Sequence, residues 1–472
     1  MVIVPKNKNN IEQSVKTENP LGTVNPGKLL LQFAIPAIVS NLVIASYNLV
    51  DQVIIGNVVG MLGIAATNVA FPLTTISAAV SYLFGTGGAA NFSLKLGEGD
   101  EKTANKYAGS TLSLLAITGV VISILVLIFI NPLVSAFGST DTVRPYAMTY
   151  TAIIAIGIPF GTFTTGASAL IRADGSPRYS MWCTLIGAIF NVIGDPIAVF
   201  VFNWGIAGVA WATTISQILT AGIAVFYFLR KTKNISIKKE NLKPNLKLAK
   251  RTCALGLTPC INQLGLTVLQ ITLNNTLRYY GALSVYGSDI PLSCVGAISK
   301  LSVIFTAFTT GIAQGCQPIQ GFNYGAKRYD RVKKTLGLAL LSASVFSVSA
   351  FAAFHLFPRQ IMLIFGENDP LYLEFAVHYL RVFMFMVFLS GIQPVAATFF
   401  PAIGKGTRGL WISLSRQVLF ILPLLLILPL FFGLEGAIFA GPISDFAAAC
   451  VSTLLIATEV KKMSALQRAQ TL

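Results

Sequence analysis

Long apolar runs separated by short polar segments fill almost the whole chain from residue 28 onward. Each run holds about 20 residues or more, the length that an α-helix needs to cross roughly 30 Å of hydrocarbon. The pattern therefore predicts twelve membrane-spanning helices. They cover residues 28–56, 62–90, 108–131, 146–170, 179–202, 206–230, 253–280, 291–318, 334–357, 372–398, 409–432 and 435–458.

The composition agrees with a polytopic membrane protein. Of the 472 residues, 54% are hydrophobic and only 11% are charged, whereas soluble domains average about 25% charged residues. The six cysteines show no CxxC spacing, which argues against a zinc site or a disulfide framework. A soluble enzyme, a disordered chain and a disulfide scaffold are excluded, and the expected fold class is an all-α polytopic membrane protein.

The distribution of charge predicts the orientation. The net charge of +16 comes from basic loops on one side of the membrane, which hold 28 of the 34 Lys and Arg residues, among them Arg172, Arg178 and nine between 230 and 251. Basic loops stay in the cytoplasm, so both termini are expected there, in a multi-pass protein of the plasma membrane. The polar first 27 residues predict no cleavable signal peptide.

The two halves of the chain resemble each other. Pro36 and Asp51 in the first span have the same separation as Pro259 and Asn274 in the seventh. Two repeats of six spans share one orientation, which predicts two six-helix bundles around a central cleft. The expected units are a cytoplasmic tail (1–27), an N-terminal bundle (28–230), a basic cytoplasmic linker (231–250), a C-terminal bundle (251–460) and a second cytoplasmic tail (461–472).

Five stretches of the sequence resemble the multidrug and toxic compound extrusion (MATE) transporters, and two of them are most similar to the bacterial MepA-like branch. The stretches are FAIPAIVSNLVIASYNLVDQVIIG, NVIGDPIAVF, GIAGVAWAT, PIQGFNYGAKRYDR and SRQVLFILPLLLILP. The resemblance implies a 6+6 helix architecture in a bacterial inner membrane. It also implies antiport, in which a cation flows inward while an amphipathic, often cationic, compound flows out.

Charged side chains inside spans are expensive and therefore indicate function. Asp51 lies near the outer end of the first span, with Tyr47 one turn earlier on the same face. Asn191 and Asp195 share a face of the fifth span because they are four residues apart, and Pro196 is expected to loosen the backbone hydrogen bonding after them. Either acid could instead lie at the outer membrane surface, in contact with water.

The resemblance implies that Asp51, Asn191 and Asp195 act together with a threonine of the sixth span, which is Thr213 here. Desolvation penalises the charge of a buried carboxylate, so two facing carboxylates can hold a proton and release it when the cavity opens. The same oxygens could coordinate Na⁺. These four residues and Tyr47 are the predicted cation-coupling group, with H⁺ or Na⁺ left open. No cofactor and no other metal is expected.

The C-terminal half departs from one branch of the family. NorM-like members carry further acids in the seventh and tenth spans, where this chain has no acid and Ser390, respectively. Coupling is therefore expected in the N-terminal half. Arg416 and Asp445 are predicted to form an internal ion pair, with Lys300 as the alternative cation for Asp445. Contact between these charges and the substrate is the second possibility.

Polar and flexible side chains are the candidates for the substrate cavity, since such cavities are mainly apolar with a few polar groups. The small residues of LFGTGGAANFS and TTGIAQG are expected to let spans approach closely. Besides Tyr47, the cavity candidates are Gln263, Asn274, Asn275, Met384, Met386 and Gln393.

The sequence thus predicts a secondary-active multidrug efflux antiporter that works by alternating access and is not an enzyme. No GxxxxGK[ST] motif supports ATP as the energy source. The expected partners are small amphipathic or cationic drugs, H⁺ or Na⁺, and membrane lipids. No nucleic acid is expected, and the chain is expected to be a monomer. The alternative is a flippase for a lipid or lipid-linked substrate of the same superfamily.

Overall fold

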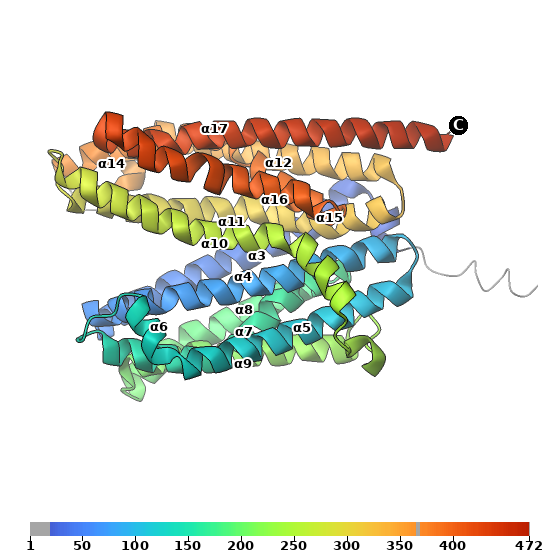
Figure 1. The fold of residues 1–472 in the computed structure, drawn as a ribbon, viewed down its shortest axis with the longest axis horizontal. Helices are drawn as coiled ribbons and strands as arrows, with labels where there is room; N and C mark the ends of the chain where they lie inside the picture. The colour runs from blue at the N-terminus through green and yellow to red at the C-terminus, as the bar shows by residue number, and fades with distance from the viewer. Residues whose placement is uncertain (1–18, 365–368, 472) are drawn as a thin grey trace, which may run out of the picture.

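The computed structural model describes residues 19–364 and 369–471, and most of the predicted N-terminal tail lies outside them. Long helices run side by side in two groups stacked one over the other (Figure 1). We call α3–α9 the N-terminal bundle and α10–α17 the C-terminal bundle. The spans of the N-terminal bundle are α3 (Pro26–Val58), α4 (Met61–Gly97), α5 (Glu101–Ile128), α7 (Arg144–Ala173), α8 (Pro177–Pro196) and α9 (Gly205–Arg230).

The C-terminal bundle is less regular than the N-terminal one. Its tenth span is broken into two helices, because Pro394 has no backbone N–H and fits only the first turn of a helix. The short helix α2 (Pro20–Thr23) precedes the first span, and the short helices α6 (Ile130–Ala136) and α13 (Pro358–Leu363) lie between spans. The long elements are α10 (Leu246–Ala282), α11 (Asp289–Gly325), α12 (Tyr329–Leu356), α14 (Pro370–Phe383), α15 (Ile392–Ala402), α16 (Gly406–Leu414) and α17 (Leu422–Thr471).

The prediction of twelve spans is confirmed. Eleven helical segments of the described chain are long and apolar enough to cross a membrane, and the last of them runs over 65 residues from Gly406 to Gln470. At about 1.5 Å per residue this segment is about three times as long as the hydrocarbon is thick. It contains two spans, because Gly433 adopts a φ of 57° and a ψ of −135° and the chain turns back there (Figure 1).

The two bundles touch along α3 and α4 of the first and α10 and α11 of the second. Glycines permit this approach. A β-carbon on Gly256 of α10 would collide with the carbonyl oxygen of Leu83 on α4, and one on Gly97 of α4 would collide with that of Phe322 on α11. These contacts lie toward one end of the molecule, where α3 begins, α17 ends and the linker enters α10 (Figure 1). We call this end the terminal end.

Two further segments hold the bundles together at the terminal end. The segment before α3 donates from the Asn19 amide to the side-chain oxygen of Asn234 in the linker, over 3.3 Å. Its Leu21 carbonyl accepts from Asn323 at 2.9 Å and from Arg331 at 3.3 Å, both in the C-terminal bundle. The segment around α2 therefore bridges the linker and the C-terminal bundle.

Asp174, between α7 and α8, fixes the linker to the N-terminal bundle. Its carboxylate is fully buried. It accepts the hydroxyl of Tyr227 at 2.6 Å and the backbone N–H groups of Lys233, Asn234 and Ile235 at 2.8, 2.6 and 2.9 Å. One side chain thus satisfies three consecutive turn amides that would otherwise have no acceptor in the protein.

Asp174→Ala is expected to release this linker. Each buried donor left without an acceptor costs about 1–3 kcal/mol, and the freed segment carries many Lys and Arg residues that trypsin recognises. Limited digestion of the purified protein should cut the linker about tenfold faster, or more, than in the wild type. Tyr227→Phe removes only one of the four bonds and is the matched control. Equal cleavage rates for Asp174→Ala and the wild type would contradict the anchoring role.

Candidate cation and substrate site

Two carboxylates from different helices meet inside the N-terminal bundle. Asp51 comes from α3 and Asp195 from α8, and their exposed fractions are 9% and 0%. The two side chains lie within hydrogen-bonding reach of each other. Neither acid is an exposed interfacial group, so both need a partner inside the protein.

Asn191 links this acid pair to α9. Its side-chain amide lies 3.3 Å from an oxygen of Asp195, one turn away on the same helix, and 3.2 Å from the hydroxyl of Thr213. Because i and i+4 residues share a helical face, α8 presents the amide and the carboxyl together. The structure therefore brings four of the five predicted cation-coupling residues into one cluster.

The backbone changes where α8 passes the cluster. Pro196 cannot donate a hydrogen bond to the preceding turn, and the helix continues as a π-helical segment over Ile197–Val201. The loosening predicted from the proline is thus seen as a wider helical turn. Such π segments in membrane helices often mark functional sites.

The polar atoms of this cluster that are free to bind a cation are oxygens. One oxygen each of Asp51, Asn191 and Asp195 is buried and has no hydrogen-bond partner in the described structure. Carboxylate, amide and hydroxyl oxygens suit hard cations, and a shared proton would equally relieve two facing carboxylates. In the part of the chain that the structure describes, no three His, Cys, Asp or Glu side chains are grouped to hold a metal ion.

A polar cavity of about 160 Å³ lies in the N-terminal bundle beside this cluster. Tyr47 and Asn191 line it, so the cavity borders the cation cluster through these two residues. Its wall is rich in hydroxyl and amide groups from α3, α4, α7, α8 and α9, with one residue from α11 of the C-terminal bundle. These polar wall residues are Ser40, Asn41, Tyr82, Thr164, Thr165, Ser168, Thr184, Ser216, Gln217, Thr220 and Gln314.

None of the other six predicted substrate residues lines this cavity; all of them lie in the C-terminal bundle. Asn274 accepts the side-chain amide of Gln270 at 2.9 Å. Met384 and Gln393 are each 8% exposed and belong to the packed interior. Gln263 and Met386 are half-buried, and Asn275 is exposed.

Arg172 corrects one assignment made from the sequence. The charge pattern placed it in a loop, but it belongs to the last turn of α7 and lines the polar cavity.

Tyr150 is a residue of the site that the sequence did not single out. It is 7% exposed, and it interacts electrostatically with both Asp51 and Asp195. A hydroxyl one helix away from an acid has no local sequence signal.

The predicted ion pair in the C-terminal bundle is formed. Arg416 donates from Nε to Asp445 at 2.7 Å, and the Ser390 hydroxyl donates to the other oxygen of Asp445 at 2.9 Å. Arg416 lies in a π-helical segment, Ser415–Ile421, that turns it toward α17. The alternative partner, Lys300, is exposed on α11 and makes no ion pair among the described residues.

Asp445→Asn is expected to lower the free energy of unfolding by about 1–3 kcal/mol, because it leaves the Arg416 guanidinium without its carboxylate. Four buried cysteines allow the measurement, since a thiol-reactive dye reports their exposure on heating. Arg416→Gln combined with Asp445→Asn should regain part of the loss. Lys300→Gln is the matched control, and equal melting temperatures for it and Asp445→Asn would rule out a stabilising ion pair.

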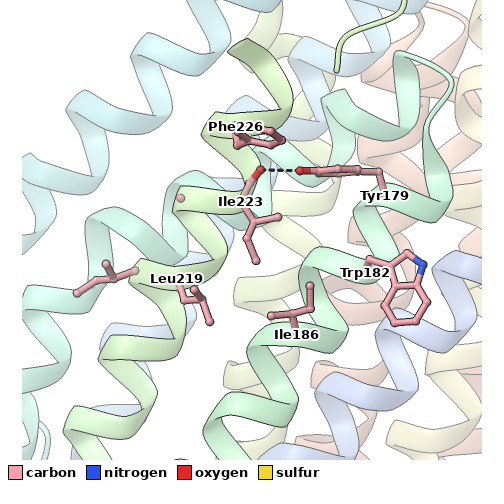
Figure 2. Close-up of a pocket in the computed structure, with 8 residues that line it drawn as sticks. Tyr179, Trp182, Ile186, Leu219, Ile223 and Phe226 are labelled. Atoms are coloured by element: carbon pink, nitrogen blue, oxygen red, sulfur yellow. Dashed lines mark hydrogen bonds between the residues drawn. The ribbon is translucent and has the colours of Figure 1, made fainter. Parts of the chain in front are cut away.

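A larger groove lies between α8 and α9 on the outer surface of the N-terminal bundle. It encloses about 610 Å³ and is lined by apolar and aromatic side chains, including Trp182, Ile186 and Phe226 (Figure 2). Trp182 is 56% exposed, and the Tyr179 hydroxyl is already engaged by the Ile223 carbonyl at 3.0 Å. This groove lacks the convergent polar groups of a specific site and fits contact with lipid tails.

Comparison with known proteins gives concordant matches. The sequence pattern of the MatE family matches residues 36–197 and 266–427. Multidrug export protein MepA of Staphylococcus aureus is 24% identical over 429 residues, which cover 91% of this chain and 93% of that protein. The structure of the MATE multidrug transporter DinF-BH is 32% identical, with a TM-score of 0.84, and the match covers 93% of this chain and 97% of that one. An outward-facing multidrug resistance MATE family transporter has a TM-score of 0.88 at 20% identity, over 95% and 99% of the two chains.

Proposed function

Because the chain belongs to the MatE family, whose pattern it matches over both halves, we propose that it is a secondary-active multidrug efflux antiporter of the plasma membrane. It exports amphipathic, often cationic, compounds and takes up H⁺ or Na⁺ in exchange. The names of its relatives, such as multidrug export protein MepA, support this substrate class. The transported compounds cross the bilayer unchanged, so the proposal is a transporter and not an enzyme.

The contact between Asp51 and Asp195 is the observation that carries the proposal. Two buried carboxylates in contact repel each other unless a cation lies between them. A proton or a Na⁺ ion supplies that charge, with Asn191 and Thr213 as further oxygen ligands. When the cation leaves on the other side of the membrane, the repulsion returns and drives the next conformational step.

Alternating access follows from where the bundles touch. The units proposed to move are residues 28–230 and 251–460, which pack together at the terminal end. The basic loops assign this end and both termini to the cytoplasm. In the state with the bundles joined at the cytoplasmic end, the cleft between them opens to the outside. In a second state the bundles separate at the cytoplasmic end and join at the opposite end, so that the cleft opens to the cytoplasm. The protomer contains a complete site, so we propose that a monomer is sufficient.

Dye extrusion from proteoliposomes tests the proposal. Ethidium efflux is measured under a pH gradient alone and under a Na⁺ gradient alone. Efflux driven only by the pH gradient makes Asp51 and Asp195 proton carriers, and efflux driven only by Na⁺ makes them ligands. If neither gradient moves the dye while a fluorescent lipid crosses the bilayer, the flippase replaces the antiporter.

A further inference from the structure

The polar cavity of the N-terminal bundle has one charged residue in its wall, and that residue is a cation. Arg172 lines the cavity together with hydroxyl and amide groups, and no Asp or Glu does so. This charge is opposite to the one expected for a pocket that takes only cationic compounds. The cavity therefore needs an explanation beyond the acid pair.

The guanidinium of Arg172 is poorly satisfied by the protein itself. It has five N–H donors, and the hydrogen bond formed within the described chain is a long one, 3.4 Å from Nη1 to the Ser180 hydroxyl. None of the ion pairs among the described residues involves Arg172. The nearest acid in sequence, Asp174, already accepts four hydrogen bonds from Tyr227 and the linker.

A role for Arg172 in capping α7 does not explain its position. Cations near a helix C-terminus commonly bind the last carbonyl groups. Here the carbonyls of Leu170, Ile171 and Arg172 already accept the N–H groups of Asp174, Ser176 and Gly175, respectively. The end of the helix is closed by its own backbone, and the side chain of Arg172 is left facing the cavity.

The size of the cavity limits what can enter. About 160 Å³ is smaller than the roughly 300–1,000 Å³ of a pocket for a whole drug, but it has room for a carboxylated ring. From Thr184 to Asn191, both in its wall, α8 rises about 10 Å. One end of the cavity thus holds the Arg172 guanidinium. The other end borders the Asp51–Asp195 pair, which favours a positive charge.

We infer that this cavity is a subsite for the carboxylate of amphipathic substrates, with Arg172 as the residue that selects it. The inference rests on the proposed export function and assigns to Arg172 the recognition of the carboxylate in substrates that carry one. A guanidinium binds a carboxylate through two parallel N–H···O bonds. The cationic part of the same molecule then lies toward the acid pair, and the neutral wall groups bind the ring between them.

Two dyes that differ in this one group test the inference. Rhodamine 19 carries a free carboxylate, and rhodamine 6G is its ethyl ester. Fluorescence polarisation with the full chain in nanodiscs, against empty nanodiscs, should show the wild type binding rhodamine 19 about tenfold tighter than the ester. Arg172→Gln should weaken rhodamine 19 about tenfold and change rhodamine 6G less than twofold, and Arg172→Lys should retain part of the preference.

The wild type provides a second readout that does not depend on a variant folding. Benzoate, added at constant Na⁺ concentration in exchange for chloride, should compete with rhodamine 19 and leave rhodamine 6G bound. Equal weakening of both dyes by Arg172→Gln, or no preference in the wild type, overturns the subsite. If the preference is present but proteoliposomes export neither dye, the proposed transport function fails while the subsite stands.

Discussion

Asp195→Asn protein, reconstituted at the density of the wild type, is expected to extrude ethidium no faster than protein-free liposomes. Asparagine nearly matches the shape of aspartate and can still accept the amide of Asn191, which lies 3.3 Å away. It can neither take up a proton at neutral pH nor supply a negative charge to Na⁺. Asp51 then has no second carboxylate with which to hold the coupling cation, and the gradient no longer drives export. The measurement is the initial rate of efflux under the gradient that drives the wild type.

Asp141→Asn is the matched control for this loss. It removes the same charge from the same bundle, but Asp141 is exposed in the turn before α7, so the variant should transport at the wild-type rate. Asp51→Asn should fail as completely as Asp195→Asn. Wild-type drug resistance in cells that express Asp195→Asn at an equal level would show that the acid pair does not couple transport.

Gly256→Ala is expected to weaken the contact between the bundles. The added methyl group meets the backbone carbonyl of Leu83 on α4, which cannot move aside as a side chain can. Overpacking of this kind costs about 1–3 kcal/mol, enough to shift a two-state equilibrium by about 5- to 150-fold. Since the clash exists only when the bundles are joined at the terminal end, the state open at that end gains population and export slows.

Spin labels on opposite bundles measure this shift. Lys102→Cys on α5 and Lys334→Cys on α12 are exposed positions near the terminal end, and the native cysteines are replaced in the background. The distance distribution between the labels should move to larger values in Gly256→Ala. Gly337→Ala is the control, because a β-carbon there meets no neighbouring atom within 4 Å. An unchanged distribution in Gly256→Ala would remove α4 and α10 from the gating contact.

Most of the fold could be predicted from the sequence, because the membrane limits the choices. A helix must satisfy its own backbone in hydrocarbon, so run length alone defines each span, and all twelve predicted spans appear. The predicted first span, 28–56, and the observed Pro26–Val58 differ by two residues at each end. The tenth span was predicted as one helix, and it is broken because local backbone geometry around Pro394 outweighs apolar length.

The cation cluster was only partly accessible to sequence reasoning. Helical geometry places Asn191 and Asp195 on one face without any knowledge of their neighbours. The contact of Asp195 with Asp51 on another helix has no such local rule, and it was inferred through resemblance to a family. Tyr150 stayed unnoticed because nothing near it in the chain indicates that it faces the acids.

The sequence by itself determined the number of membrane spans, their apolar character and the residues that are too costly to bury without a purpose. Tertiary structure alone decided which of these residues meet. It paired Asp445 with Arg416 instead of Lys300, placed the polar cavity in the N-terminal bundle and turned Arg172 from a loop charge into part of its wall. The reason is physical: hydrophobicity sets how a helix sits in the bilayer, whereas the faces that touch depend on how side chains of distant helices interlock.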